Sequence, residues 1–256
     1  MPRIFFYLIL LFALLTGSHG FSQDSSREIP SPEESEKKIS GGVSVDFVSK
    51  YVWRGIPSSE GPVLQSEGWF SAYGAQVLVW SNLDLGEAPD GRLNEIDLQA
   101  SYEYEWKHLK VEPIFLFYFF PNQGGTAPTG EGGIKLSYTL GPFHFTTGHA
   151  FDIMEFRGAY FGAVGASYQH EFYSYFSLET GAGIGWGNAQ FNEAYFALPK
   201  AALNVFQWNL ALTFTPCRYL YLTPHLKVSS ILDGSLRGQV SSPTNVYGGL
   251  QIGAEF

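Results

Sequence analysis

The chain has 256 residues, of which 45% are hydrophobic and 17% aromatic, with a mean hydropathy of −0.03. Its net charge of −9 argues against binding to a phosphate backbone, so no nucleic-acid partner is expected. The single cysteine, Cys217, excludes a disulfide framework and a thiolate metal site. Such a composition suits a soluble domain or a membrane β-barrel, in which lipid-facing and lumen-facing residues alternate and average out.

The first 20 residues have the pattern of a secretory signal peptide. Arg3 precedes an apolar run from 4 to 15, and the following residues are mostly small. The run is too short to span a bilayer, which takes roughly 20 apolar residues. We predict cleavage after Gly20, with a site after Ser22 and an uncleaved anchor helix as alternatives. Residues 21–40 are polar and charged and predict a disordered periplasmic leader before a single domain at 41–256.

Within that domain, hydrophobicity alternates with a period of two, which is the signature of β-strands. In 95–106, apolar and aromatic residues take one face and Glu, Asp, Gln and Ser take the other. Several runs approach the roughly 9 to 11 residues that a tilted membrane strand needs. We predict twelve strands, at about 42–54, 62–72, 75–83, 94–106, 109–120, 131–140, 143–152, 158–169, 173–186, 202–215, 218–229 and 245–256. The alternation is poorest in the third and eighth of these.

The connections between the predicted strands alternate strictly in length. Short turns are expected at 73–74, 107–108, 141–142, 170–172 and 216–217, and long loops at 55–61, 84–93, 121–130, 153–157, 187–201 and 230–244. Outer-membrane barrels have short periplasmic turns, longer outer loops and an even number of strands. The sequence therefore predicts an all-β fold, a transmembrane antiparallel up-and-down β-barrel in the outer membrane with both termini in the periplasm.

The chain ends on an apolar strand face closed by an aromatic residue. Leu250, Ile252 and Phe256 share this face, which resembles the C-terminal signal that the barrel assembly machinery recognises. That machinery and outer-membrane lipid are therefore expected partners. The alternative interpretation is an ordinary terminal strand of a soluble sandwich or barrel.

The first predicted hairpin carries a family resemblance. It reads Phe47-Val48-Ser49, then an aromatic residue, Arg54-Gly55-Ile56 and later Gly61-Pro62, with Tyr73-Gly74 and Val79-Trp80-Ser81-Asn82 behind it. Over about forty residues this resembles the TorF-like porin family of Gram-negative outer-membrane proteins. The loop sequence Pro57-Ser58-Ser59-Glu60 departs from the Ser/Gln-like pattern expected there. The resemblance implies a small barrel with pore activity and implies little about its substrate.

Charged residues occur on the polar faces of the predicted strands. Charge at the bilayer centre costs several kcal/mol, so these side chains are expected to face the lumen or its mouths. A lumen with both signs of charge predicts a cation-leaning water path, whereas pairing of the same charges across the interior would plug the barrel. Arg54 is expected to anchor the first outer loop or to place a charge at the pore mouth. The candidate pore-lining residues are Lys50, Arg54, Glu95, Asp97, Glu103, Glu105, Lys110, Glu112, Lys135, Glu179 and Lys227.

The histidines predict neither catalysis nor metal binding. His170 with Ser174, or His149 with Asp152, are near enough in sequence to pair, but neither lies in a His-x-Ser-Asn motif of barrel lipases. Residues 144 and 149, five apart, fall on opposite faces of a strand. We therefore expect no enzyme activity and no cofactor.

The function that the sequence favours is a porin-like channel for passive diffusion of small polar or cationic solutes. Two alternatives remain open. One is a non-conducting structural or adhesion barrel whose outer loops bind partners, and the other is a barrel lipid hydrolase. The transported solute and the oligomeric state are not specified by the sequence.

Overall fold

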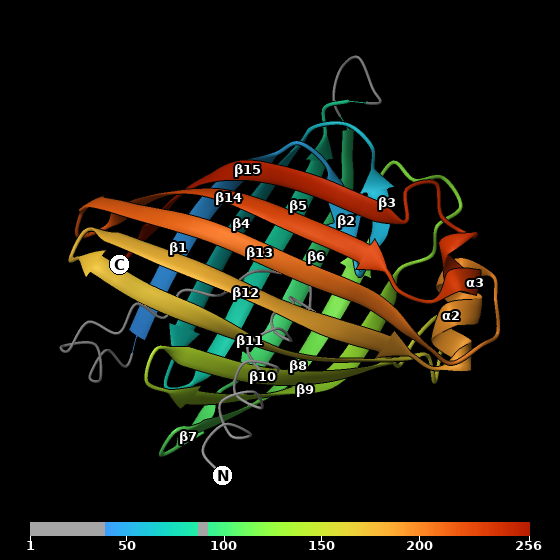
Figure 1. Ribbon diagram of the computed structural model, residues 1–256, viewed down its shortest axis with the longest axis horizontal. Helices are drawn as coiled ribbons and strands as arrows, with labels where there is room; N and C mark the ends of the chain where they lie inside the picture. Colours follow the sequence, from blue (N-terminus) through green and yellow to red (C-terminus); the bar gives the residue numbers. More distant parts are fainter. Residues whose placement is uncertain (1–38, 87–91) are drawn as a thin grey trace, which may run out of the picture.

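A computed structural model describes residues 39–86 and 92–256 (Figure 1). The predicted signal peptide and nearly all of the predicted leader lie outside the described residues. The domain expected from residue 41 begins with a strand at Ile39.

The described residues form a closed antiparallel barrel of twelve strands, as predicted. The barrel closes where β1 pairs with β15, with Phe47 opposite Leu250. Because β6 and β7 both pair with β8, they form one interrupted wall strand. The wall elements are β1 (Ile39–Val48), β4 (Val63–Ala72), β5 (Ala75–Asp84), β6 (Arg92–Tyr102), β7 (Tyr104–Trp106), β8 (Leu109–Phe119), β9 (Thr129–Leu140), β10 (Phe143–Asp152), β11 (Tyr160–Tyr173), β12 (Phe176–Gly187), β13 (Ala202–Cys217), β14 (Leu220–Ile231) and β15 (Thr244–Glu255).

The barrel is apolar outside and polar inside. On β1, Val43, Val45 and Phe47 are 57%, 42% and 52% exposed, whereas Ser44 and Asp46 between them line the interior. Each wall strand pairs on both sides, so backbone groups find partners within the wall, as a hydrocarbon environment requires. This is the construction of an integral outer-membrane β-barrel. Among the described helices, none is long and apolar enough to cross a membrane.

Short and long connections segregate to opposite ends of the barrel. The C-terminus and the short turns lie at one end, and the helices α2 (Ala189–Phe196) and α3 (Gly234–Arg237) lie at the other (Figure 1). The turn at Tyr73-Gly74 has φ values of 53° and 87°, the left-handed pair that a two-residue hairpin of type I′ requires. The predicted alternation of loop lengths is therefore confirmed.

Two predicted turns were wrong by a few residues. β11 continues through the expected turn at 170–172 to Tyr173, because Glu171 and Tyr173 still pair with β12 around an irregularity in register. β13 likewise continues through the expected turn at 216–217, with Cys217 opposite Leu220. Pro216 is tolerated because it lies where the register shifts and no regular ladder bond is needed.

The first predicted strand, 42–54, was also wrong in its second half. β1 ends at Val48, and the chain then forms a separate two-stranded hairpin from β2 (Tyr51–Trp53) and β3 (Ile56–Ser59). This hairpin lies at the same end of the barrel as α2 and α3 (Figure 1).

A new charge should affect stability differently on the outer and inner faces of the wall. Val79 on β5 is 50% exposed on the outer face, whereas Gln76 on the same strand lines the interior. We expect Val79→Lys to lower the free energy of unfolding in lipid vesicles by about 2–4 kcal/mol, since a mid-membrane lysine is costly. Gln76→Lys is the matched control and should change stability little. Equal effects of the two substitutions would contradict the assignment of faces.

Candidate functional site: the lumen and the hairpin at its outer end

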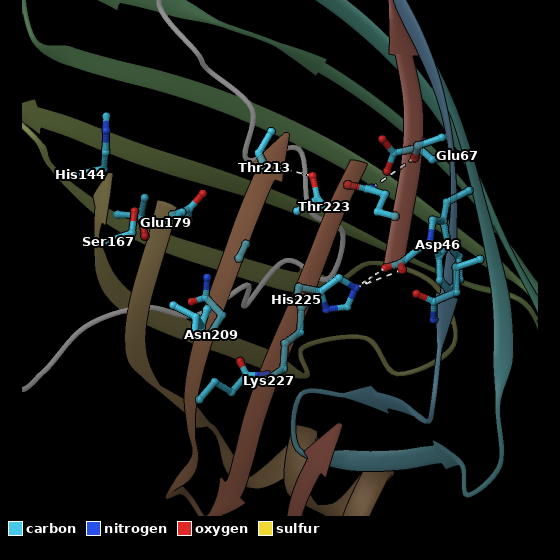
Figure 2. Close-up of a pocket in the computed structure, with 18 of the residues that line it drawn as sticks. Asp46, Glu67, His144, Ser167, Glu179, Asn209, Thr213, Thr223, His225 and Lys227 are labelled. Carbon is cyan, nitrogen blue, oxygen red and sulfur yellow. Dashed lines mark hydrogen bonds and ion pairs between the residues drawn. The ribbon is translucent and has the colours of Figure 1, made fainter. Parts of the chain in front are cut away.

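The barrel interior contains a cavity of about 490 Å³. Uncharged polar side chains are the largest group in its lining and come from strands all around the wall, such as Ser44, Gln65, Ser137 and Asn209. In Figure 2, Asn209, Lys227 and His225 lie on neighbouring strands along one side of this cavity. A polar interior of this kind is an environment through which a small polar solute could diffuse.

Charged residues of the lumen pair along the wall. Lys110 Nζ lies 3.3 Å from Glu103 Oε1, and Lys135 Nζ lies 3.5 Å from Glu112 Oε2. These pairs join neighbouring strands, so they neutralise one another while the cavity stays open between them. Pairing was expected to plug the lumen under one of the alternatives above, and in the described residues it does not fill the space.

A third charged pair joins two strands, β14 and β1, that are separated by β15. His225 Nε2 on β14 lies 2.8 Å and 3.0 Å from the two carboxylate oxygens of Asp46 on β1 (Figure 2). The intervening strand β15 contributes Gly249, where an added Cβ would lie 2.7 Å from His225 Nε2 and 2.8 Å from Asp46 Oδ1. A side chain at 249 would separate the two groups, so this glycine permits the contact.

Eight of the eleven predicted lining residues border the cavity, and three do not. Glu95 and Asp97 are on the inner side but are buried, at 7% and 0% exposure, and Glu105 is exposed on β7. The residues that border the cavity are Lys50, Arg54, Glu103, Lys110, Glu112, Lys135, Glu179 and Lys227. The cavity is also bordered by five charged or titratable residues that were not predicted as lining, Asp46, Glu67, Glu255, His144 and His225. Their period-two position on polar strand faces was the available signal.

The β2–β3 hairpin turns back into the barrel around a buried arginine. Arg54 and Gly55 occupy the turn with φ values of 48° and 89°. The Arg54 side chain is 1% exposed, and its Nη1 and Nη2 donate to the two carboxylate oxygens of Glu131 at 2.7 Å and 2.6 Å. Tyr118 donates a further hydrogen bond to Glu131 at 3.0 Å. Of the two roles expected for Arg54, these contacts support the anchor.

Aromatic rings surround the Arg54 guanidinium. Its Cζ lies 4.5 Å from the ring centroid of Trp53 and 4.6 Å from that of Phe161. Cation–π attraction is strengthened where water is excluded. Glu131 was predicted only as the first residue of a strand, because nothing in the local sequence reveals that a distant arginine reaches it.

The histidine pairs considered for catalysis are not formed. The Asp152 carboxylate accepts hydrogen bonds from Thr129 and from two backbone amides of the following loop. His149 instead lies on the outer wall, where Tyr160 and Thr147 contact its ring nitrogens at 2.8 Å and 3.2 Å. Thr147 donates to the Ala163 carbonyl at 3.0 Å, so the chain of hydrogen bonds runs from Tyr160 through His149 and Thr147 to the backbone.

The positions of the histidines also bear on metal binding. His144 and His149 lie five positions apart on the regular strand β10, so their side chains project from opposite faces, and of the two only His144 borders the cavity. Among the described residues, no group of three or more His, Cys, Asp or Glu side chains is arranged to hold a metal ion.

The closed wall, its apolar outer face and its polar interior define an outer-membrane β-barrel with a porin-type fold. Its fold is similar to that of the NanC porin, with a TM-score of 0.53 and 13% identity over 84% of this chain and 98% of that one. It is also similar to the KdgM porin, with a TM-score of 0.51 and 10% identity over 84% and 98% of the two chains. No protein-family model and no curated protein sequence matches the chain. The resemblance to TorF-like porins therefore stays a prediction.

The contacts of Glu60, which follows strand β3, predict an effect of acid pH on stability. Glu60 pairs with Lys50 and accepts hydrogen bonds from Ser241 and Ser242 at 2.9 Å and 3.2 Å. The hydrogen bond from Lys50, followed by that from Ser241, lowers the pKa of Glu60 below its usual 4.5. Because the pKa is lower in the folded state, this stabilisation is present at neutral pH and is lost as pH falls through the lowered value.

We expect Glu60→Gln to lower the melting temperature at pH 7 by a small amount, since an exposed pair contributes under about 1 kcal/mol. The difference from the unmodified protein should shrink as pH falls below 4.5 and through the lowered pKa of folded Glu60, because protonation removes the charge that pairs with Lys50. Glu155→Gln, in another outer loop, is the control. A difference that stays constant from neutral to acid pH would contradict this interpretation.

Proposed function

We propose that the protein is a channel for passive diffusion of small polar solutes across the outer membrane, with a weak preference for cations. The observation that carries this proposal is the polar cavity enclosed by a closed barrel. An interior built only for stability would be filled by packed side chains. The porin fold shared with NanC and KdgM supports the same class of function.

The charge of the lining sets the expected selectivity. Its six carboxylates are Asp46, Glu67, Glu103, Glu112, Glu179 and Glu255, and its five permanent cations are Lys50, Arg54, Lys110, Lys135 and Lys227. The two signs nearly balance, so the pore should be less selective than the chain's net charge of −9 suggests. Neutral hydroxylated solutes and small cations suit such a lining.

Planar-bilayer recording of the refolded protein under a KCl gradient tests this function. We expect discrete current steps and a reversal potential that indicates a slight preference for K⁺ over Cl⁻. Silence from protein confirmed as folded would favour the non-conducting barrel, whose outer loops would then be the place to seek a partner.

Removing one lining carboxylate should shift the selectivity. Glu103→Gln removes the carboxylate that lies 3.3 Å from Lys110, so the lining becomes less negative and the reversal potential should shift toward anion selectivity. Glu105→Gln is the control, because it removes the same charge two residues along the chain at an exposed position outside the cavity lining. It should shift the reversal potential less. Equal shifts, or none in a conducting protein, would contradict the role of Glu103 in the pore.

The remaining proposals concern partners. Leu250 and Ile252 are 40% and 51% exposed on the outer face of β15, and Phe256 is 65% exposed at its end. This position supports the proposal that the assembly machinery reads these side chains during insertion. Oligomerisation stays a proposal without an assigned surface.

A further inference from the structure

The cavity ends at its outer side against the β2–β3 hairpin, where Lys50, Tyr51, Val52 and Arg54 form its border. We propose that this hairpin is a plug that closes the outer mouth of the pore, and that the ion pair between Arg54 and Glu131 is its latch. The proposal rests on the pore function proposed above.

The hairpin reaches almost across the barrel. It follows β1, whose neighbours are β4 and β15, yet Arg54 pairs with Glu131 on β9, on the far side of the strand order. A loop that only connected β1 to β4 would not need this reach, because Val48 and Val63 are already paired directly. The residues between them are therefore an insertion, and its Arg54 reaches the opposite wall.

The tip of the hairpin is fitted to the wall. An added Cβ at Gly55 would lie 2.6 Å from Ile231 Cδ1 on β14 and 2.9 Å from Val205 Cγ2 on β13. Trp53 packs on Tyr195 of α2, with ring centroids 4.9 Å apart, and on Tyr118 of β8 at 6.2 Å. The tip thus contacts the wall and an outer-loop helix at several points around the mouth.

The base of the hairpin fills the other side of the mouth. Tyr51 and Val52 belong to a buried apolar cluster with Val63, Trp80 and Tyr247, from β4, β5 and β15. The ring centroids of Tyr51 and Trp80 are 5.5 Å apart. Together, the tip and base occupy the outer end of the lumen on both sides of the latch.

A buried ion pair suits a plug that must be released. Arg54 and Glu131 lose their hydration when the plug is seated, and their mutual attraction offsets this loss only partly. When the hairpin leaves, both charges regain water, so the displaced state is not heavily penalised. An all-apolar plug of the same size would expose its whole surface to water on release and would be held more permanently.

Two variants test the plug. Arg54→Ala removes the latch, and a second variant replaces residues 49–62 with Asn-Gly, which joins the paired residues Val48 and Val63 by a two-residue turn. If the open form makes up less than about a tenth of the unmodified protein, releasing the plug should raise the current about tenfold or more. We expect that rise, per folded protein in planar bilayers, in both variants. Folding is checked by circular dichroism and protease resistance in vesicles.

Arg218→Ala, in a short turn at the opposite end of the barrel, is the matched control and should leave the current unchanged. If the unmodified protein and both variants conduct equally, the hairpin is not a plug although the pore function stands. If all of them are folded and silent, the pore function itself fails. If only the Asn-Gly variant conducts, the hairpin is the plug but the ion pair is not its latch.

Discussion

Backbone hydrogen bonding inside lipid is the constraint on which this structure depends. A membrane offers no partners for exposed amide and carbonyl groups, so the last strand must return to the first. The pairing of β1 with β15, extended by mutual hydrogen bonds between Gly41 and Phe256, satisfies that requirement. Once the wall is closed, the period-two pattern divides every strand into a lipid face and a lumen face. The polar residues that lipid excludes are then collected in one interior, where they create the cavity.

The interior balances two opposing needs, since charges must be neutralised and space must remain. Pairs between neighbouring strands, such as Lys135 with Glu112, meet the first need at the wall and leave the centre clear. At the outer end, a segment inserted between β1 and β4 supplies the proposed filling. The Arg54–Glu131 pair makes this filling specific, because two planar groups must meet in one geometry. The proposed conduction and the proposed closure are thus assigned to separate parts of the same chain.

Sequence reasoning succeeded where a residue's environment follows from its neighbours in the chain. Val43, Val45 and Phe47 alternate with Ser44 and Asp46, and their faces were predictable because side chains of a strand alternate. It failed at 49–59, where the first strand was expected to continue to 54 and a loop to follow, but the chain leaves the wall and forms the β2–β3 hairpin. It also failed at 170–172 and at 216–217, where short turns were expected but cross-strand pairing continues.

By itself, the sequence determined the class of fold, the number of strands, the ends at which long and short loops lie, and the face on which charges fall. Each of these follows from local periodicity and from the cost of charge in lipid. The tertiary structure alone decided which charges meet, because Asp46 with His225 and Arg54 with Glu131 are 179 and 77 residues apart. It also decided that the first loop folds inward, since only barrel closure creates the opposite wall that the hairpin contacts.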